Sequence, residues 1–134
     1  MATYGGGVNI FDYPSESFKV YRKEHHNFYS LNSNEILAMY EDRFDIIWLG
    51  SNSGGINKYD RKLKKFVHYG YIPDEPNSLN EPKIRAIYED DEGILWIGTN
   101  GGGLNRLDRG ANRYTHYKYD IDNPEGISSN KVYA

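Results

Sequence analysis

The chain repeats one pattern every 48 residues without a gap. Turns of the form Gly-Gly-hydrophobic-Asn begin at Gly6, Gly54 and Gly102. Self-similarity at a fixed period of this size indicates stacked or radially arranged copies of one supersecondary unit. The repeat therefore constrains the fold more than any other feature of the sequence. Other residues recur with the same spacing: Asp12, Asp60 and Asp108, Tyr21, Tyr69 and Tyr117, and Ala38, Ala86 and Ala134.

Each copy contains four short stretches with strand character. In one copy they are residues 84–88, 94–98, 104–108 and 113–117, which alternate apolar and polar side chains or are rich in aromatic and β-branched ones. Polar or Gly-rich turns separate them, and no segment has the apolar spacing of a helix. Four short antiparallel strands per copy are typical of a β-propeller blade. We therefore predict an all-β chain built from four-stranded antiparallel blades.

The same pattern predicts the strand order within a blade. The first two strands are the most apolar and should lie near the propeller axis, whereas the polar and aromatic strand 113–117 should form the outer edge. Trp48 and Trp96 occupy one repeat position on the second strand. We expect each tryptophan to pack between neighbouring blades.

The chain holds fewer copies than a ring needs. The copies run over residues 3–50, 51–98 and 99–134, so residues 1–134 are expected to form a partial β-propeller of 2.75 copies, or about three blades. Propellers have about four to eight blades. Two explanations stay open: a piece of a longer propeller, or a unit that completes a ring with other copies. Either way, open strand edges lead us to expect self-association.

Residues 87–105 resemble the two-component regulator propeller repeat, through a Trp-x-Gly step and the Gly-Gly-hydrophobic-Asn turn. The linkers 74–80 and 122–128 are similar to those of the same family. The resemblance implies a periplasmic sensor region of a bacterial hybrid two-component system, of the kind that senses glycan breakdown products. The first copy departs from the pattern at residues 43–45 and 23–29. Of the linkers, the first is therefore the one in which we least expect the contacts typical of the family.

Composition excludes several classes of function. The net charge is −3, with Lys and Arg spread along the chain, which argues against a nucleic-acid partner. The absence of Cys excludes disulfides and thiol chemistry. No apolar run is long enough for a membrane span, and the start of the chain has no secretory signal pattern. We predict no cofactor, no bound metal and no membrane contact by this segment.

Several apparent motifs are better explained as scaffold. The triple glycines 5–7 and 101–103 precede strands rather than helices, which excludes a phosphate loop. The acidic stretches 41–45 and 89–92 recur at one hairpin and are expected to be solvated turns. Residues 120–126 have the wrong spacing for an EF-hand. No catalytic triad or acid–base pair can be assembled, so an enzyme is not expected. Structural roles are also expected for His68 and His116, for Asp12, Asp60 and Asp108, and for Asn9, Asn57 and Asn105.

A binding surface is the more plausible functional feature. The loops after the second and fourth strands of a blade share one face of a propeller, and the linkers there are residues 24–33, 71–82 and 120–130. Tyr4, Asn52 and Asn100 differ between copies while the neighbouring glycines do not. Tyr and Asn suit saccharides, by stacking and paired hydrogen bonds. The candidate ligand-binding residues are Tyr4, Asn52, Ser53 and Asn100.

Two functions are therefore compatible with the sequence. The first is a non-catalytic, ligand-sensing propeller of a bacterial two-component sensor, in the periplasm, with an oligosaccharide ligand. The alternative is a structural or protein–protein interaction propeller that has no small ligand. A propeller lyase or glycosidase would need an acid–base pair on the channel, and the repeats supply none.

Overall fold

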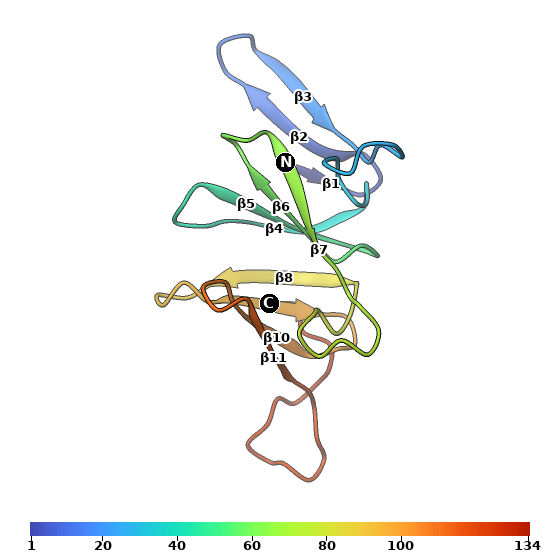
Figure 1. Ribbon diagram of the computed structural model, residues 1–134, viewed down its shortest axis with the longest axis vertical. Coiled ribbons are helices and arrows are strands. Elements are labelled where there is room, and N and C mark those ends of the chain that lie inside the picture. Colours follow the sequence, from blue (N-terminus) through green and yellow to red (C-terminus); the bar gives the residue numbers. More distant parts are fainter.

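The computed structural model describes all 134 residues and contains eleven strands and no helix, so no helix could cross a membrane (Figure 1). Three antiparallel sheets have the orders β1-β2-β3, β4-β5-β6-β7 and β11-β10-β9-β8. The chain is thus all-β and built from propeller blades, as predicted. The strands are β1 (Ala2–Thr3), β2 (Gly7–Asp12), β3 (Ser17–Tyr21), β4 (Ile36–Glu41), β5 (Ile46–Ser51), β6 (Ile56–Asp60), β7 (Lys65–Tyr69), β8 (Ile84–Glu89), β9 (Leu95–Thr99), β10 (Leu104–Asp108) and β11 (Arg113–Tyr117).

The first strands of the sheets converge. β4 and β8 lie side by side, and β1 lies against β4, while β3, β7 and β11 form the opposite edges of their sheets. This is the order predicted from the strand composition, with the first strand innermost. The first sheet differs from the other two, because β1 aligns with the ends of β5 and β9 in the repeat and the sheet contains no counterpart of β4 and β8. β1 pairs with β2 only at Gly7 and Val8.

The hydrophobic core lies between neighbouring sheets. Trp48 on β5 is 1% exposed and packs with Ile84 and Leu95 of the third sheet, so its predicted position between blades is confirmed. Trp96 occupies the same position on β9, where no further sheet follows, and it is only partly buried. Its ring packs on Tyr117 of its own sheet, with the centroids 5.9 Å apart.

The acidic turn residues are not all solvated, which corrects the sequence interpretation. Asp42 is 5% exposed and Glu89 is 6% exposed. One oxygen of Asp42 accepts bonds from the backbone N–H groups of Phe44 and Ile46, at 2.9 and 3.1 Å, and the other accepts the Trp48 indole N–H at 2.8 Å. Asp90 makes the same three kinds of bond one repeat later. The aspartate therefore orients the tryptophan that fills the space between sheets.

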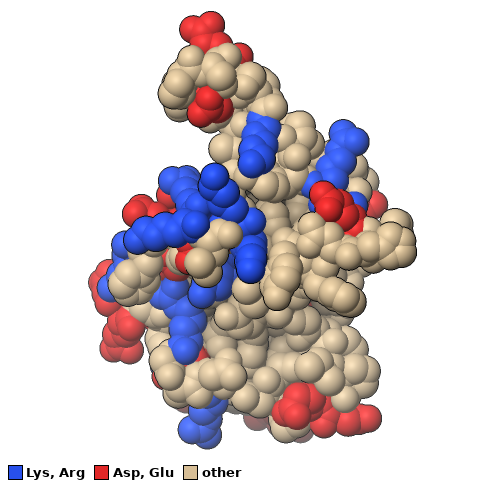
Figure 2. Space-filling view, turned by 45° about the horizontal axis from the view of Figure 1, so that its top comes forward, with Lys and Arg blue, Asp and Glu red and all other residues tan.

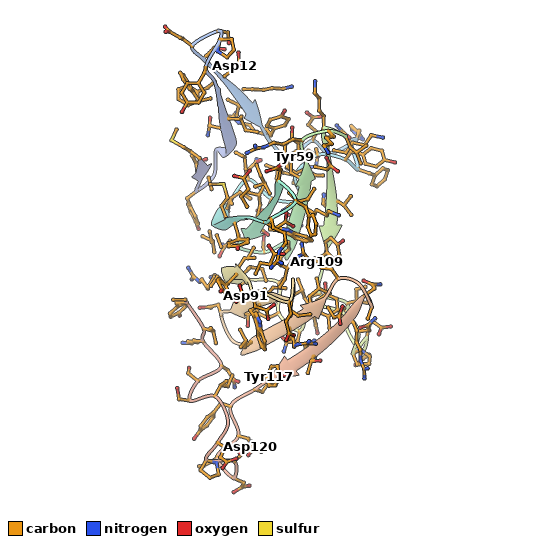
Figure 3. All side chains as sticks on the ribbon, turned by 90° about the vertical axis from the view of Figure 1, so that its left-hand side faces the viewer. Asp12, Tyr59, Asp91, Arg109, Tyr117 and Asp120 are labelled. Atoms are coloured by element: carbon orange, nitrogen blue, oxygen red, sulfur yellow. The ribbon has the colours of Figure 1, made fainter.

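Arginines complete the junction between the second and third sheets. Arg109 donates hydrogen bonds to Asp42 on one sheet and to Glu89 on the other (Figure 3). Arg43 adds a second ion pair to Glu89, with Nε 3.1 Å from the carboxylate. Burial by itself would raise the pKa of Asp42, but the bonds from Trp48, the Phe44 and Ile46 amides and Arg109 outweigh it and lower that pKa. Asp42 is therefore ionised at neutral pH.

The recurring Asp and Gly residues have the structural roles expected of them. Asp60 accepts a bond from the Lys62 amide at 2.8 Å, and Asp108 accepts one from the Ala111 amide at 3.0 Å. Gly55 and its two repeat equivalents have φ between +76° and +79°. A Cβ at Gly55 would lie 2.4 Å from the carbonyl oxygen of Tyr69. Only glycine can therefore occupy this position, where two backbone segments approach closely.

We predict that Arg109→Ala destabilises the protein by about 3–5 kcal/mol, because it leaves the buried Asp42 without an ionic partner and Glu89 with only the half-exposed Arg43. Arg61→Ala is the matched control. Arg61 holds the same repeat position and pairs with Glu41 at 3.0 Å, but both side chains are about half exposed. That loss should cost only about 0–1 kcal/mol. Urea unfolding of both variants measures the difference, and equal losses would contradict the importance of the buried pairs.

Candidate functional site

The linkers between sheets and the turns after the second strands lie together at one end of the molecule. The backbone N–H of Asn32 donates to Oδ1 of Asn57, at 2.9 Å, and the Asn57 amide returns a bond to Asn32 at 2.7 Å. Asn80 and Asn105 repeat this pair. His68 adds a 2.7 Å contact from its Nε2 to the carbonyl oxygen of Ser30. The expected structural roles of Asn57, Asn105 and His68 are confirmed, although the two asparagines bind a linker rather than their own turn.

The first linker makes the same contacts as the second despite its different sequence. Ser30 accepts a bond from the Glu24 amide at 2.9 Å, and Ser78 accepts one from the Ile72 amide at 3.2 Å. Leu31 and Leu79 follow these serines and are buried between sheets. The expectation that contacts carry over least safely in the first linker is therefore wrong, because the short Ser-Leu-Asn segment that makes them is present in both.

The predicted ligand-binding residues lie along this end, beside the starts of the inner strands. Asn52 bonds Glu35 twice, from its backbone N–H at 2.9 Å and from its side-chain amide at 2.7 Å. Tyr4 forms a β-bridge with Glu35 and is 70% exposed. Asn100 forms a β-bridge with Lys131, and Ser53 is exposed. No hydrogen bond joins any two of the four predicted residues, which occupy three successive blades.

A hollow of about 370 Å³ opens among the inner strands at this end, and it is lined by Leu37, Arg85 and Tyr133. These three side chains occupy one position of the 48-residue repeat. The register shifts between Ile36 and Ala38 in β4, and again between Ile84 and Ala86 in β8, so Leu37 and Arg85 each stand at a β-bulge. A bulge redirects a side chain out of the regular alternation of a strand.

Arg85 has no acidic partner within the protein. Its guanidinium makes no hydrogen bond or ion pair, and Nε is buried without an acceptor. The guanidinium carbon lies 5.5 Å from the centroid of the Tyr133 ring. The Tyr133 hydroxyl donates to Oδ1 of Asn100 at 3.0 Å, which ties this group to a predicted site residue. We refer to Leu37, Arg85, Asn100 and Tyr133 as the channel-mouth cluster.

Sequence reasoning placed Asn100 in this cluster but missed the other three members. The signal was available, because the repeat position of Leu37, Arg85 and Tyr133 holds an aliphatic, a cationic and an aromatic residue in turn. The alternation of a regular strand does not indicate which way the side chain at a bulge points. The apolar and polar pattern of the strands therefore did not predict that these residues line the hollow.

The remaining candidate motifs do not form a second site. No three His, Asp or Glu side chains are grouped so that they could hold a metal ion. In the segment 120–126, which projects from the third sheet, Asp120 and Asn123 use their side-chain oxygens to accept backbone N–H bonds from Asp122 and Glu125 (Figure 3). These are local turn contacts.

Charge is less evenly spread in space than along the chain. Figure 2 shows Lys and Arg side chains gathered in one area of the drawn face, with acidic side chains toward its margins. The sequence places four basic residues within five positions at the turn between β6 and β7, namely Arg61, Lys62, Lys64 and Lys65. The expectation of dispersed basic charge is therefore not met on this face.

The free edge of the first sheet is apolar. A groove of about 590 Å³ runs between β2 and β3 on one side and β4 and β5 on the other. Phe11 and Phe18 line it and are 38% and 53% exposed. Their repeat equivalents in the second sheet, Tyr59 and Phe66, are buried against Tyr21 of the preceding sheet. The first sheet thus exposes a surface that its neighbour buries.

Comparison with known proteins identifies the repeat. The fold is that of a propeller segment, and residues 30–53 and 78–101 match the family model described as Two component regulator propeller. These two segments, 48 of the 134 residues, are similar to that repeat, which agrees with the family resemblance seen in the sequence. A search of curated proteins gives no match.

Solved structures share the fold. One is described as the extracellular domain of the hybrid two component system BT3049 from B. thetaiotaomicron, with 24% identity, a TM-score of 0.83 and 98% of this chain covered. A second, from the system BT4673 of the same organism, has 19% identity, a TM-score of 0.50 and 87% of this chain covered. The chain spans 18% and 22% of the lengths of those domains.

We predict that Arg85→Leu leaves the free energy of unfolding within about 1 kcal/mol of the parent value, since the guanidinium makes no hydrogen bond or ion pair and only its contact with the Tyr133 ring is lost. Leucine is the residue that β4 carries at the same bulge, so the backbone accommodates it. Urea unfolding checks this result. A large loss of stability would show that Arg85 is part of the scaffold and not of a binding site.

Proposed function

We propose that the chain is part of a non-catalytic, ligand-sensing propeller in the extracytoplasmic region of a bacterial two-component sensor, with an oligosaccharide as the ligand. The observation that carries this proposal is the channel-mouth cluster, where one position of the repeat holds a different side chain in each copy, namely Leu37, Arg85 and Tyr133. Arg109 and Arg85 contrast, since the first is fully paired and the second has no acidic partner.

The comparisons support the setting of this proposal. The matched family is that of two-component regulator propellers, and the domains with the same fold are described as extracellular. A location in the periplasm, in a protein anchored to the membrane outside this segment, accords with both. This chain spans about a fifth of the length of those domains. We therefore include the kinase output and the partners of the whole protein in what is proposed, and not in what is observed.

The side chains at the channel mouth suit a saccharide. Tyr4 is exposed, and the Tyr133 ring borders the hollow, so each presents an aromatic face on which a sugar ring can stack. Asn100 accepts one bond from Tyr133 through Oδ1 and retains two amide N–H donors for a ligand hydroxyl. The cluster contains no acid–base pair, in agreement with binding rather than catalysis.

The alternative, a propeller that serves protein–protein interaction, is favoured by the apolar groove at β2. We propose that a second copy of the chain covers it. The third sheet ends in a face that carries Trp96 and Tyr117, equivalent to Trp48 and Tyr69 of the second sheet. That face is complementary, by repeat symmetry, to the surface that carries Phe11 and Phe18.

A glycan ligand should raise the melting temperature, because a ligand that binds only the folded state stabilises it. We expect at least one member of a panel of plant and host oligosaccharides to do so in a thermal shift assay. Tyr133→Ala should abolish the shift, whereas Tyr13→Ala should not, since Tyr13 is 82% exposed and lies outside the cluster. No shift with any saccharide would leave the interaction propeller as the function.

Self-association is tested by light scattering after gel filtration. The chain should form dimers or larger species at micromolar concentration, and Phe18→Glu should shift it toward monomer. Phe28→Glu is the control, because Phe28 is 90% exposed but does not line the groove. A well-folded monomer at high concentration would contradict the head-to-tail contact.

A further inference from the structure

We propose that Arg85 is a carboxylate-binding residue, and that the ligand at the channel mouth is an acidic saccharide, with a uronic acid unit placed against this arginine. The inference rests on the proposed sensing function and names the ligand class of the same site. The inference is based on the positive charge of Arg85, which has no counter-charge within the cluster. A neutral sugar would not supply that counter-charge.

Arg85 differs from the three arginines of the chain that form ion pairs. Arg43, Arg61 and Arg109 each form an ion pair with a glutamate on the first strand of a blade. Arg85 lies on the same kind of strand, yet it reaches none of these carboxylates, and its Nε is buried without an acceptor. A donor in this state gains most from a ligand that supplies the missing oxygen.

The carboxylates nearest in sequence to the mouth are already engaged. Glu35 accepts the side-chain amide of Asn52 at 2.7 Å, and Glu81 accepts the backbone N–H of Lys83 at 3.2 Å. Neither forms an ion pair with Arg85. The positive charge of Arg85 is therefore available to an anion from outside the chain.

Tyr133 orients the guanidinium for this role. The ring lies 5.5 Å from the guanidinium carbon, a distance at which the cation and the aromatic face attract each other. The hydroxyl of Tyr133 is fixed in turn by Asn100. An arginine held in this way loses little freedom when it binds, and its planar set of N–H donors matches the two oxygens of a carboxylate.

The rest of the hollow suits the sugar that carries the acid. Leu37 also lines the hollow and supplies an apolar surface, against which the C–H face of a pyranose ring can lie. The free amide N–H groups of Asn100 can donate to ring hydroxyls. A volume of about 370 Å³ falls within the range of small-ligand sites, about 300–1,000 Å³. Charge recognition and sugar contacts are thus combined in one place.

The experiment compares digalacturonate with its neutral counterpart, a galactose disaccharide, by isothermal titration calorimetry. The parent chain should bind the acidic disaccharide at least tenfold more tightly. Arg85→Gln should remove that preference, whereas Arg22→Gln, which changes an exposed arginine outside the cluster, should keep it. Circular dichroism and urea unfolding confirm that each variant is folded.

The outcomes separate the two proposals. If the galactose disaccharide binds as tightly as digalacturonate and Arg85→Gln changes neither affinity, the sensing function stands and the carboxylate site is wrong. Equal loss of digalacturonate binding in both arginine variants would show non-specific charge attraction and would also overturn the site. If neither acidic nor neutral saccharides bind the parent chain, both proposals fail together.

Discussion

The contact between neighbouring sheets is the interaction on which the rest of this structure depends. A sheet of four short strands cannot bury both of its faces, so each one requires the next. Trp48 fills the space between the second and third sheets, and Asp42 holds the indole N–H in place. Arg109 then joins the two sheets through their acidic side chains. Every other feature is carried on blades that this junction aligns.

Much of the fold followed from the period of the sequence. Because the copies align without a gap, the strand signals in one copy reinforce those in the others, and β10 and β11 begin and end where the pattern predicted. The burial of Asp42 and Glu89 did not follow, since it depends on Arg109 from a distant part of the chain. A clue was the equal spacing from Asp42 to Trp48 and from Asp90 to Trp96.

The candidate site was only partly predictable for a related reason. Asn52 and Asn100 were predicted from their place in a turn; Asn100 accepts a bond from Tyr133 of the channel-mouth cluster, whereas Asn52 bonds Glu35. Arg85 was hidden, because it stands at a β-bulge, where the alternation of a strand gives no direction. A comparison of the copies would have indicated Arg85, because its position differs between copies that otherwise match.

Repetition also separates scaffold from ligand contacts more clearly than a single domain would. One position of the repeat holds Leu37, Arg85 and Tyr133 in the successive copies. The backbone has the same β-bulge at the first two of these residues. The buried Asp and Trp recur unchanged in the two copies that contain them. The positions that hold the sheets together are thus separate from the inner-strand position whose side chain differs between copies.

The linkers have a mechanical consequence. The segment that joins the first two sheets is fastened to both, since Asn34 accepts amide bonds from Gly5 and Gly7 of the first, and Asn32 is paired with Asn57 of the second. Twisting one blade against the next would break several of these bonds at once. These bonds fix the angle between the first two blades, so a force applied to one of them is passed to the other through the linker.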